Sequence, residues 1–271
     1  KLQPPRSMPQ APRPKITAII PARMGSSRFP GKPLAKICGH TMIEHVLRRV
    51  SLAKSLSEVV VATCDKEIAD EVERCGGRAI MTSDQHERCT DRIEEAADVV
   101  GGDIIVNIQG DEPFVTPEMI DLAVAPMLAD SSLVCTNLMA PIIDLETLED
   151  PNEVKVVFDQ KMDALYMSRE AIPSLKKGGT FDHAWKQICV IPFTNTFLHQ
   201  FSKLAPTPLE IRESVDMMRA IEHGYKVRMV PCEATGLSVD TEEDRAEAER
   251  QMASDSLFQS AWSEVPGARR H

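Results

Sequence analysis

Residues 16–33 read ITAIIPARMGSSRFPGKP and contain the strand and the loop that decide the fold. The apolar run from Ile16 to Ile20 ends at Pro21, which predicts a short buried strand of a parallel sheet. The loop from Ala22 to Pro33 is interrupted by glycines and prolines and carries three cations. Because ligands of parallel α/β sheets bind beyond the carboxyl ends of the strands, we expect this loop to border a ligand site.

Predicted strands and helices alternate through the first half of the chain. Further strands are expected at residues 59–63, 79–81, 103–108 and 132–137. Helices are expected at residues 42–50, 67–75, 91–100 and 117–129. This alternation predicts an α/β fold with a doubly wound, mostly parallel sheet and helices on both of its faces. The loops that follow the strands should meet at one edge and form a single cleft, namely residues 22–33, 82–92 and 109–114.

From Val154 onward the predicted strands follow one another closely. They are expected at residues 154–158, 164–167, 188–193 and 227–230, with an acidic helix inside 206–224. We interpret residues 154–235 as a smaller antiparallel lobe inserted into one domain that spans residues 15–253. Residues 1–14 are expected to form a flexible arm, and residues 254–271 a loosely attached tail.

The composition excludes several classes of protein. The formal net charge is -10, so non-specific binding to nucleic acid or to an anionic membrane surface is not expected. The seven cysteines are scattered and form no C-x-x-C pair, which argues against a disulfide framework and against a structural zinc site. No apolar run approaches the length of a membrane span. We therefore expect a cytoplasmic protein with reduced cysteines.

The cations of the first loop are Arg23, Arg28 and Lys32, and its glycines allow a ligand to approach the backbone closely. Such a loop can bind a triphosphate and neutralise the charge that develops as pyrophosphate leaves. The spacing fits neither a Walker A motif nor the G-x-G-x-x-G motif of NAD-dependent dehydrogenases. The alternative, a solvated basic loop, is less consistent with three clustered cations in an acidic protein.

Two further segments place carboxylates near the predicted cleft. The segment NIQGDEP ends a strand with Asp111, and Asp240 precedes a helix in the segment SVDTEED. Each segment could instead be an ordinary turn or helix cap, with Thr241 as the N-cap residue. Carboxylate oxygens are also the ligands that Mg²⁺ prefers where it bridges phosphates, so both aspartates are candidate metal ligands.

With these segments in this order, the chain from Ile16 to about Met252 resembles the 3-deoxy-manno-octulosonate (Kdo) cytidylyltransferases. The matching segments are residues 21–34, 42–46, 59–63, 107–113, 154–157, 164–169, 172–173, 208–210 and 239–241. The resemblance implies a Mg²⁺-dependent enzyme that transfers CMP from CTP to an acidic sugar such as Kdo and releases pyrophosphate. It also implies a preference for CTP over UTP, ATP and GTP, and a homodimer.

The resemblance also implies roles for individual residues. Catalytic roles fall to Arg23, Arg28, Lys32 and Asp111. The CTP site is expected to consist of Ala22, Arg23, Gly25, Ser26, Ser27, Lys32, Arg92 and Gln109. The Mg²⁺ ligands are expected to be Asp111 and Asp240. The anionic acceptor is expected to meet Arg169, Gln187, Glu210 and Glu213. Positioning and charge neutralisation carry such a reaction, so no dedicated base is assigned.

Three segments depart from the family pattern. Residues 187–191 read QICVI where the family usually has His-x-Gly-x-Tyr, and Asp216-Met217 replaces its usual Glu-Gln pair. Residues 88–92 read RCTDR in place of Ser-Gly-Thr-Glu-Arg. The loss of polar partners predicts that Kdo is a secondary substrate, and a modified sugar acid or a phosphonate stays open as the acceptor. A non-catalytic nucleotide-binding module is a further alternative, although both candidate metal ligands are present.

Overall fold

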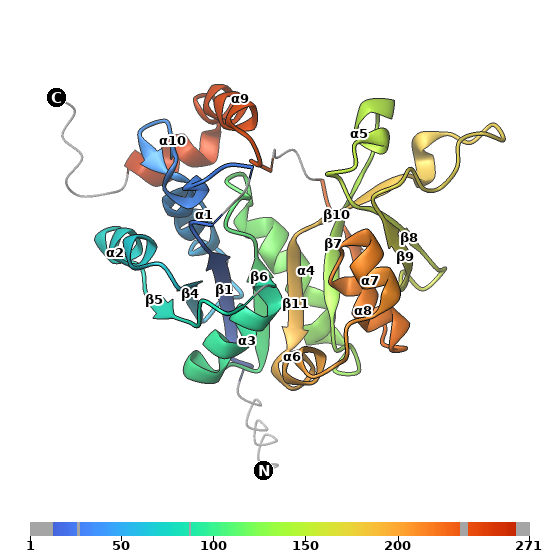
Figure 1. The fold of residues 1–271 in the computed structure, drawn as a ribbon, viewed down its shortest axis with the longest axis horizontal. Helices are drawn as coiled ribbons and strands as arrows, with labels where there is room; N and C mark the ends of the chain where they lie inside the picture. The colour runs from blue at the N-terminus through green and yellow to red at the C-terminus, as the bar shows by residue number, and fades with distance from the viewer. Residues whose placement is uncertain (1–12, 26–27, 87, 234–237, 264–271) are drawn as a thin grey trace, which may run out of the picture.

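Two sheets lie side by side in the computed structural model, which describes residues 13–25, 28–86, 88–233 and 238–263 (Figure 1). The first sheet has the strand order β11-β6-β1-β4-β5. Its strands are β1 (Ile16–Ala22), β4 (Glu58–Thr63), β5 (Ala79–Met81), β6 (Ile104–Ile108) and β11 (Val190–Thr194). All neighbouring pairs are parallel except that of β11 with β6, which is antiparallel.

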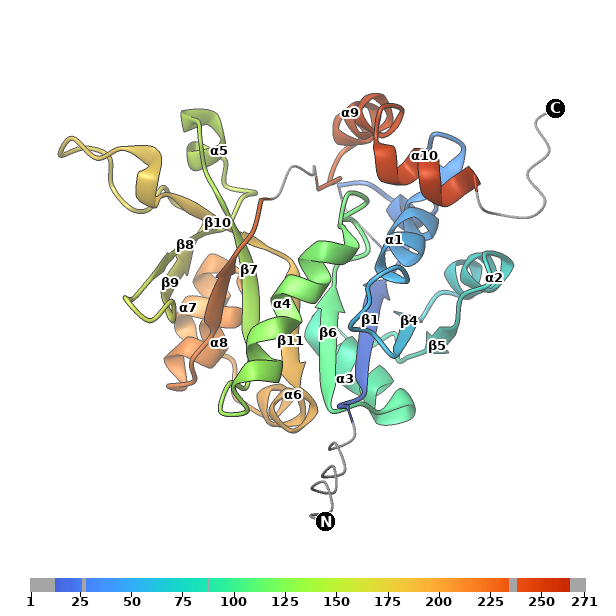
Figure 2. The ribbon, with the colours of Figure 1, turned by 180° about the vertical axis from the view of Figure 1, so that it is seen from behind.

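Helices cover both faces of the first sheet, as predicted. They are α1 (Met42–Val50), α2 (Lys66–Arg74), α3 (Cys89–Val100), α4 (Pro117–Ala129) and α6 (Asn195–Ser202). Every residue of β1 is buried, and its side chains alternate between the two faces. Ala18 and Ile20 pack with α1 and α4, whereas Ile19 packs with α3 and α6. Figure 2 shows α4 on the face opposite to the one that carries α3 in Figure 1.

The second sheet has the order β12-β7-β10-β8-β9 and is antiparallel apart from the parallel pair β7–β12. Its strands are β7 (Thr136–Pro141), β8 (Lys155–Phe158), β9 (Ala164–Ser168), β10 (Trp185–Ile188) and β12 (Arg228–Pro231). The short helices α5 (Leu145–Glu149), α7 (Pro208–Glu213) and α8 (Met217–Glu222) accompany it. Smaller elements are β2 (Lys36–Ile37), β3 (His40–Thr41) and 3-10 turns at Lys32–Leu34 and Phe181–His183.

The second sheet confirms the smaller, mostly antiparallel lobe, but its boundary differs from the prediction. The strand expected at residues 132–137 of the first sheet is instead β7, at Thr136–Pro141 of the second sheet. Conversely, β11 lies inside the predicted lobe and pairs with β6 of the first sheet. A short apolar strand has the same sequence pattern in either sheet. The periodicity of apolar residues indicates that a strand is buried, but it does not indicate which strand lies next to it.

The C-terminal segment also differs from the prediction of a loosely attached tail. After α9 (Glu242–Met252) the chain forms α10 (Ser256–Ser263). Arg49 is a buried cation on α1, and its Nη2 lies 2.5 Å from Asp255 Oδ1. Phe258 packs against an apolar cluster that includes Ile37 and Met42. The described residues contain no helix long and apolar enough to cross a membrane, and all seven cysteines are free thiols.

His45 predicts a specific dependence of stability on pH. Burial, helped by His40 and Arg49, lowers the pKa of this α1 side chain to about 4, although its Nε2 lies 2.8 Å from the carbonyl of Ile37. The unfolded chain takes up this proton below its ordinary pKa of about 6.5, whereas the folded chain does so only near 4. Its contribution to stability is therefore complete above pH 6.5 and falls by about 3 kcal/mol as the pH drops to 4.

The variant His45→Gln keeps a donor for Ile37 and does not titrate in this range. We expect its free energy of unfolding in urea to fall less than that of the wild type between pH 6.5 and pH 4. His223→Gln, at an exposed position, is the control and should follow the wild type. Identical slopes for His45→Gln and the wild type would contradict the prediction.

Candidate active site

A cavity of about 330 Å³ opens at the carboxyl ends of the strands of the first sheet. The loops after β1, β5 and β6 converge there, as predicted from their place in the sequence. The side chains around it are strongly polar and include several cations. The lining includes Ala22, Arg23, Gly25, Arg28, Lys32, His86, Arg88, Arg92, Gln109, Asp111 and Asp240. Ser26 and Ser27, also expected here, lie outside the described residues.

Lys32 lies between the two predicted metal ligands. Its Nζ donates to Asp111 Oδ2 at 2.6 Å and to Asp240 Oδ1 at 3.0 Å. Burial lowers the pKa of Lys32, but the two carboxylates outweigh it and raise the pKa above its ordinary value. The ammonium group is therefore charged at neutral pH. Since both carboxylates reach one nitrogen atom, they are also placed to share a single cation.

The two arginines of the first loop differ in their contacts. Arg28 Nη2 lies 3.2 Å from Asp240 Oδ1, and Nη1 donates to Asn152 Oδ1 at 2.9 Å. Arg28 therefore connects the first loop to the loop before β8. Arg23 is exposed at the cavity rim and has no polar partner among the described residues. Its charge is available to an anionic ligand.

A second cavity, of about 370 Å³, adjoins the first on the side of the second sheet. The two share Arg28, Gln109, Asp111 and Asp240. The remaining walls of the second cavity come from the loop before β8, from β10 and from the start of α9. Its lining includes Glu112, Asp150, Asn152, Glu153, Arg169, Gln187, Cys189 and Asp244. Two ligands, one in each cavity, would meet beside the carboxylates that hold Lys32.

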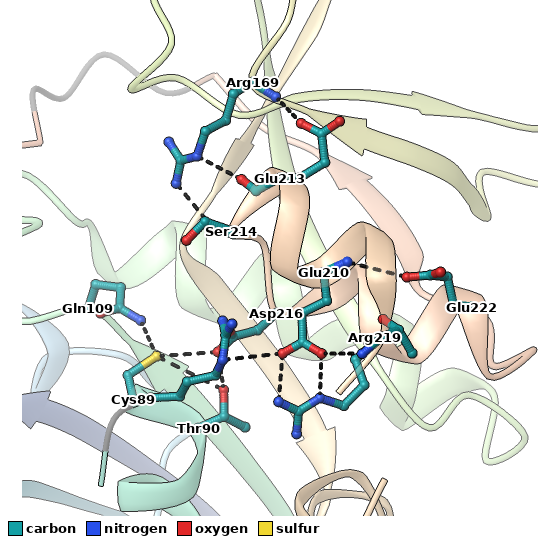
Figure 3. Close-up of polar contacts among 12 residues, drawn as sticks. Cys89, Thr90, Gln109, Arg169, Glu210, Glu213, Ser214, Asp216, Arg219 and Glu222 are labelled. Carbon is teal, nitrogen blue, oxygen red and sulfur yellow. Dashed lines mark hydrogen bonds and ion pairs between the residues drawn. The ribbon is translucent and has the colours of Figure 1, made fainter. Parts of the chain in front are cut away.

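Arg169 borders the second cavity, but most of its guanidinium is already bonded to backbone carbonyls. Nε donates to the carbonyl of Glu213 at 2.8 Å, and Nη2 to that of Ser214 at 3.3 Å (Figure 3). Nη1 donates to the carbonyl of Pro151 at 2.8 Å and to that of Asn152 at 3.4 Å. Arg169 therefore shapes the cavity wall by holding two loops together, and only part of its donor capacity faces a ligand.

Glu210 does not face the second cavity, which differs from the prediction. It is fully buried, and its carboxylate accepts from Arg219 Nη2 at 2.6 Å and Nε at 2.8 Å. Glu210 also closes the capping box that begins α7 at Thr207. Glu213 is similarly engaged, by Tyr166 Oη at 2.8 Å, by Ser168 Oγ and by the N–H of Arg169. The sequence suggested that this acidic helix faces a ligand. Glu210 instead caps the helix and forms an ion pair, and such partners cannot be identified from the residues of the helix alone.

Gln109, Gln187 and Arg92 hold neighbouring side chains in place at the two cavities. Gln109 Nε2 donates to Cys89 Sγ at 3.2 Å, and Gln187 Nε2 donates to Asn137 Oδ1 at 2.6 Å. Arg92 is buried and donates to Thr82 and Ser83 of the loop after β5. The amide nitrogens of both glutamine side chains are therefore engaged within the protein.

The electrostatics of the site disfavour covalent chemistry through a cysteine. Burial, together with the nearby carboxylate of Asp216, raises the pKa of the Cys89 thiol to about 12. Cys89 is therefore a neutral thiol at physiological pH and a poor nucleophile. Burial also raises the pKa of Glu112 to about 8, with Asp111 and Glu153 adding to the effect. Glu112, Asp111 and Glu153 therefore form a region rich in carboxylates along the second cavity.

Asn152 and Arg88 are among the residues at the site that received no role from the sequence. Asn152 accepts a hydrogen bond from Arg28, and Arg88 contacts Glu210 of α7 and Asp216, the residue before α8. Arg88 had one available signal, because it stands where the family pattern has serine. Asn152 had no distinguishing pattern, since an asparagine after proline is typical of any turn.

Comparisons with known proteins agree on one family. A family model described as "Cytidylyltransferase" matches residues 17–228. The 3-deoxy-manno-octulosonate cytidylyltransferase of Geobacter metallireducens is 44% identical over 240 residues, which cover 85% of this chain and 94% of that protein. The protein of the same name from Syntrophotalea carbinolica is 42% identical, with coverages of 88% and 98%.

A solved structure extends the likeness to the fold. It is that of CMP:2-keto-3-deoxy-manno-octonic acid synthetase complexed with CTP. The two chains are 36% identical and superpose with a TM-score of 0.84, covering 88% of this chain and 98% of the other. The likeness in fold therefore extends over most of the chain.

The position of Glu210 predicts that it stabilises the fold. Glu210→Gln removes a buried charge and leaves Arg219 without its counterion, which typically costs 3–5 kcal/mol or about half of a domain's stability. We expect a fall of about this size in the free energy of unfolding measured in urea. Glu247→Gln, which breaks an exposed pair with Arg250, is the control and should change it little. Unchanged stability of Glu210→Gln would restore Glu210 as a residue free to bind a ligand.

Proposed function

The chain belongs to the cytidylyltransferase family, and from that premise we propose that it transfers the CMP group of CTP to 3-deoxy-manno-octulosonate (Kdo) and releases pyrophosphate. The observation that carries this proposal is the convergence of Asp111 and Asp240 on Lys32 where the two cavities meet. CTP would occupy the first cavity and the sugar acid the second. As the resemblance implies, we propose that the enzyme works as a homodimer in the cytoplasm.

The cations of the first cavity suit a triphosphate. Arg23 has no competing partner among the described residues, and Arg28 and Lys32 are held by carboxylates at the edge of the cavity. Backbone N–H groups of the glycine-containing loop can add further donors. As pyrophosphate leaves, negative charge grows on the bridging oxygen, and fixed cations there stabilise that charge without rearranging.

In the reaction, a hydroxyl oxygen of the acceptor attacks the α-phosphorus of CTP in line with the departing pyrophosphate. One phosphorus–oxygen bond forms, the bond between the α-phosphorus and the bridging oxygen of pyrophosphate breaks, and the hydroxyl proton passes to solvent water. This chain contributes by holding the two substrates in their two cavities so that these atoms meet at the shared wall. Lys32 lies at that wall, and its ammonium group can move from Asp111 toward the phosphates as their negative charge grows.

Asp111 and Asp240 fit a divalent cation, since their oxygens already share one cationic group. We propose that they hold Mg²⁺ when the substrates are bound. When bound there, Mg²⁺ would offset the phosphate charge and lower the pKa of the acceptor hydroxyl. Displaced from the carboxylates, the ammonium group of Lys32 would be released toward the triphosphate.

Kdo is favoured as the acceptor because the relatives quoted above carry that activity in their names at 42–44% identity. The departures at residues 187–191 had favoured a modified sugar acid or a phosphonate, and the comparisons do not support that preference. Gln187 also keeps a polar side chain at the cavity, held by Asn137. A non-catalytic module is not favoured, since the cations and the carboxylate pair are all in place.

Pyrophosphate release tests the proposal directly. With Kdo and Mg²⁺ we expect CTP to be used with a kcat/KM of about 10⁴ M⁻¹s⁻¹ or above, and UTP, ATP and GTP at least tenfold less efficiently. A parallel series with CTP replaces Kdo by other sugar acids and by phosphonates. Equal turnover of UTP and CTP, or a phosphonate used more efficiently than Kdo, would contradict the proposal.

Asp111→Asn and Asp240→Asn test the carboxylate pair. Each change removes one charge with little change in size, so we expect kcat to fall about 10²- to 10³-fold while the circular dichroism spectrum is unchanged. Part of the loss should be recovered at high Mg²⁺ concentration. Asp84→Asn, on the loop after β5 and outside the cavity lining, is the control. Near-normal turnover of both site variants at all Mg²⁺ concentrations would refute the assignment.

A further inference from the structure

Asn152 lies in the turn between α5 and β8, and this turn is held from several sides. The N–H of Glu153 donates to the carbonyl of Asp150 at 3.2 Å and closes the turn. The buried ammonium group of Lys155 donates to the carbonyls of Asp150 and Glu153, each at 2.8 Å. Arg169 Nη1 adds a contact of 3.4 Å to the carbonyl of Asn152 itself. The backbone that carries the Asn152 side chain is therefore fixed by two cations and by its own turn.

The partners of Asn152 determine which way its side-chain amide points. Nδ2 donates to Asp150 Oδ1 at 3.0 Å, and the same oxygen accepts from the backbone N–H of Asn152 at 2.8 Å. At the other end of the amide, Oδ1 accepts from Arg28 Nη1 at 2.9 Å. An ionised carboxylate only accepts and a guanidinium only donates, so a flipped amide would satisfy neither partner. Asp150 thus orients the amide with its oxygen toward Arg28.

Arg28 depends on such partners for its position. It borders both cavities, and its side chain is 54% exposed, so packing alone does not fix its conformation. Among the described residues, the partners of its guanidinium are Asp240, 3.2 Å from Nη2, and Asn152. A long side chain loses rotamer freedom when it binds a ligand, and this cost is lower when the side chain is already held in place.

These two partners of Arg28 differ in charge. The carboxylate of Asp240 offsets the positive charge of the guanidinium, whereas the amide of Asn152 binds the guanidinium and leaves its charge unchanged. A carboxylate at position 152 would instead place Arg28 between two anions, as Lys32 is. A neutral anchor therefore suits a cation that has to bind an anionic ligand. Since a guanidinium has five N–H donors, anchoring one of them leaves others for the ligand.

We propose that Asn152 is a positioning residue that holds the guanidinium of Arg28 at the boundary of the two cavities for the triphosphate of CTP. This inference rests on the proposed function and adds a residue of the loop before β8 to the nucleotide site. Asn152 lines the second cavity and not the first, so it acts on the nucleotide through Arg28, which lines both.

A double-mutant cycle of Arg28→Met, Asn152→Ala and the combined variant tests this role. The dissociation constant of a non-hydrolysable CTP analogue is measured by calorimetry with Mg²⁺, and kcat/KM for CTP by pyrophosphate release with Kdo. Asn152→Asp keeps the size and an acceptor for Arg28 but adds a charge. Asp150→Asn combined with Asn152→Asp keeps the net charge of the turn. Gln259→Ala, an exposed amide of α10, is the distant control.

We expect the dissociation constant of the analogue to rise about tenfold in Arg28→Met and at least threefold in Asn152→Ala. The combined variant should bind as Arg28→Met does, within about twofold, because Asn152 has no guanidinium left to position. Both variants with aspartate at position 152 should bind at least as weakly as Asn152→Ala, since a carboxylate then competes with the triphosphate for Arg28. The changes in kcat/KM should follow the same order, and Gln259→Ala should match the wild type.

Additive effects of Arg28→Met and Asn152→Ala would overturn the inference, because a purely structural role of Asn152 in the turn would weaken binding with or without Arg28. It is also overturned if Asn152→Asp binds the analogue as tightly as the wild type. Both side chains are exposed, so the variants should fold. Absence of pyrophosphate release from the wild type with CTP and Kdo would refute the proposed function, whereas the binding cycle needs no turnover. Failure of the wild type to bind the analogue would overturn both.

Discussion

The ammonium group of Lys32, held between Asp111 and Asp240, is the interaction on which the arrangement of the site depends. It joins the loop after β1, the loop after β6 and the segment before α9, which are far apart in the sequence. The backbone reinforces it, since the N–H of Val239 donates to the carbonyl of Asp111 at 3.1 Å. Two carboxylates at such close range repel each other unless a cation lies between them. The fold therefore has to supply that cation before any substrate arrives.

Around the second cavity, Lys155 and Arg169 bind backbone carbonyls instead of carboxylates. The buried ammonium group of Lys155 donates to the carbonyls of Asp150, Glu153 and Arg169. Together with the carbonyl contacts of Arg169, this holds the loop before β8 in one conformation. Cations that bind backbone carbonyls hold loops in place, whereas in the first loop Lys32 and Arg28 pair with carboxylates and Arg23 has no polar partner among the described residues. Under the proposed function, this division would let an acidic protein bind two anionic substrates at one preorganised site.

Much of the first sheet could be predicted from the sequence, because each of its strands is a short apolar run followed by a punctuated loop. That pattern placed Lys32 and Asp111 at one edge of the sheet, where the structure has them. The sheet to which β7 belongs could not be predicted, because strand pairing leaves no local trace. The burial of Glu210 was missed for a related reason, since its partner Arg219 lies in the next helix. Local sequence patterns predict individual helices and strands, whereas the contacts between them become visible only in the folded structure.

The path of the chain between the two sheets limits how this protein can be recombined. The chain leaves the first sheet to form β7, returns to it with only Cys189 between β10 and β11, and leaves again for α7 and β12. The second sheet therefore cannot be removed or exchanged as one continuous segment of the chain. A chimaera with another transferase would need several junctions, one of them inside the substrate site itself. New acceptor preferences are thus more accessible through point substitutions on a constant backbone than through exchange of domains.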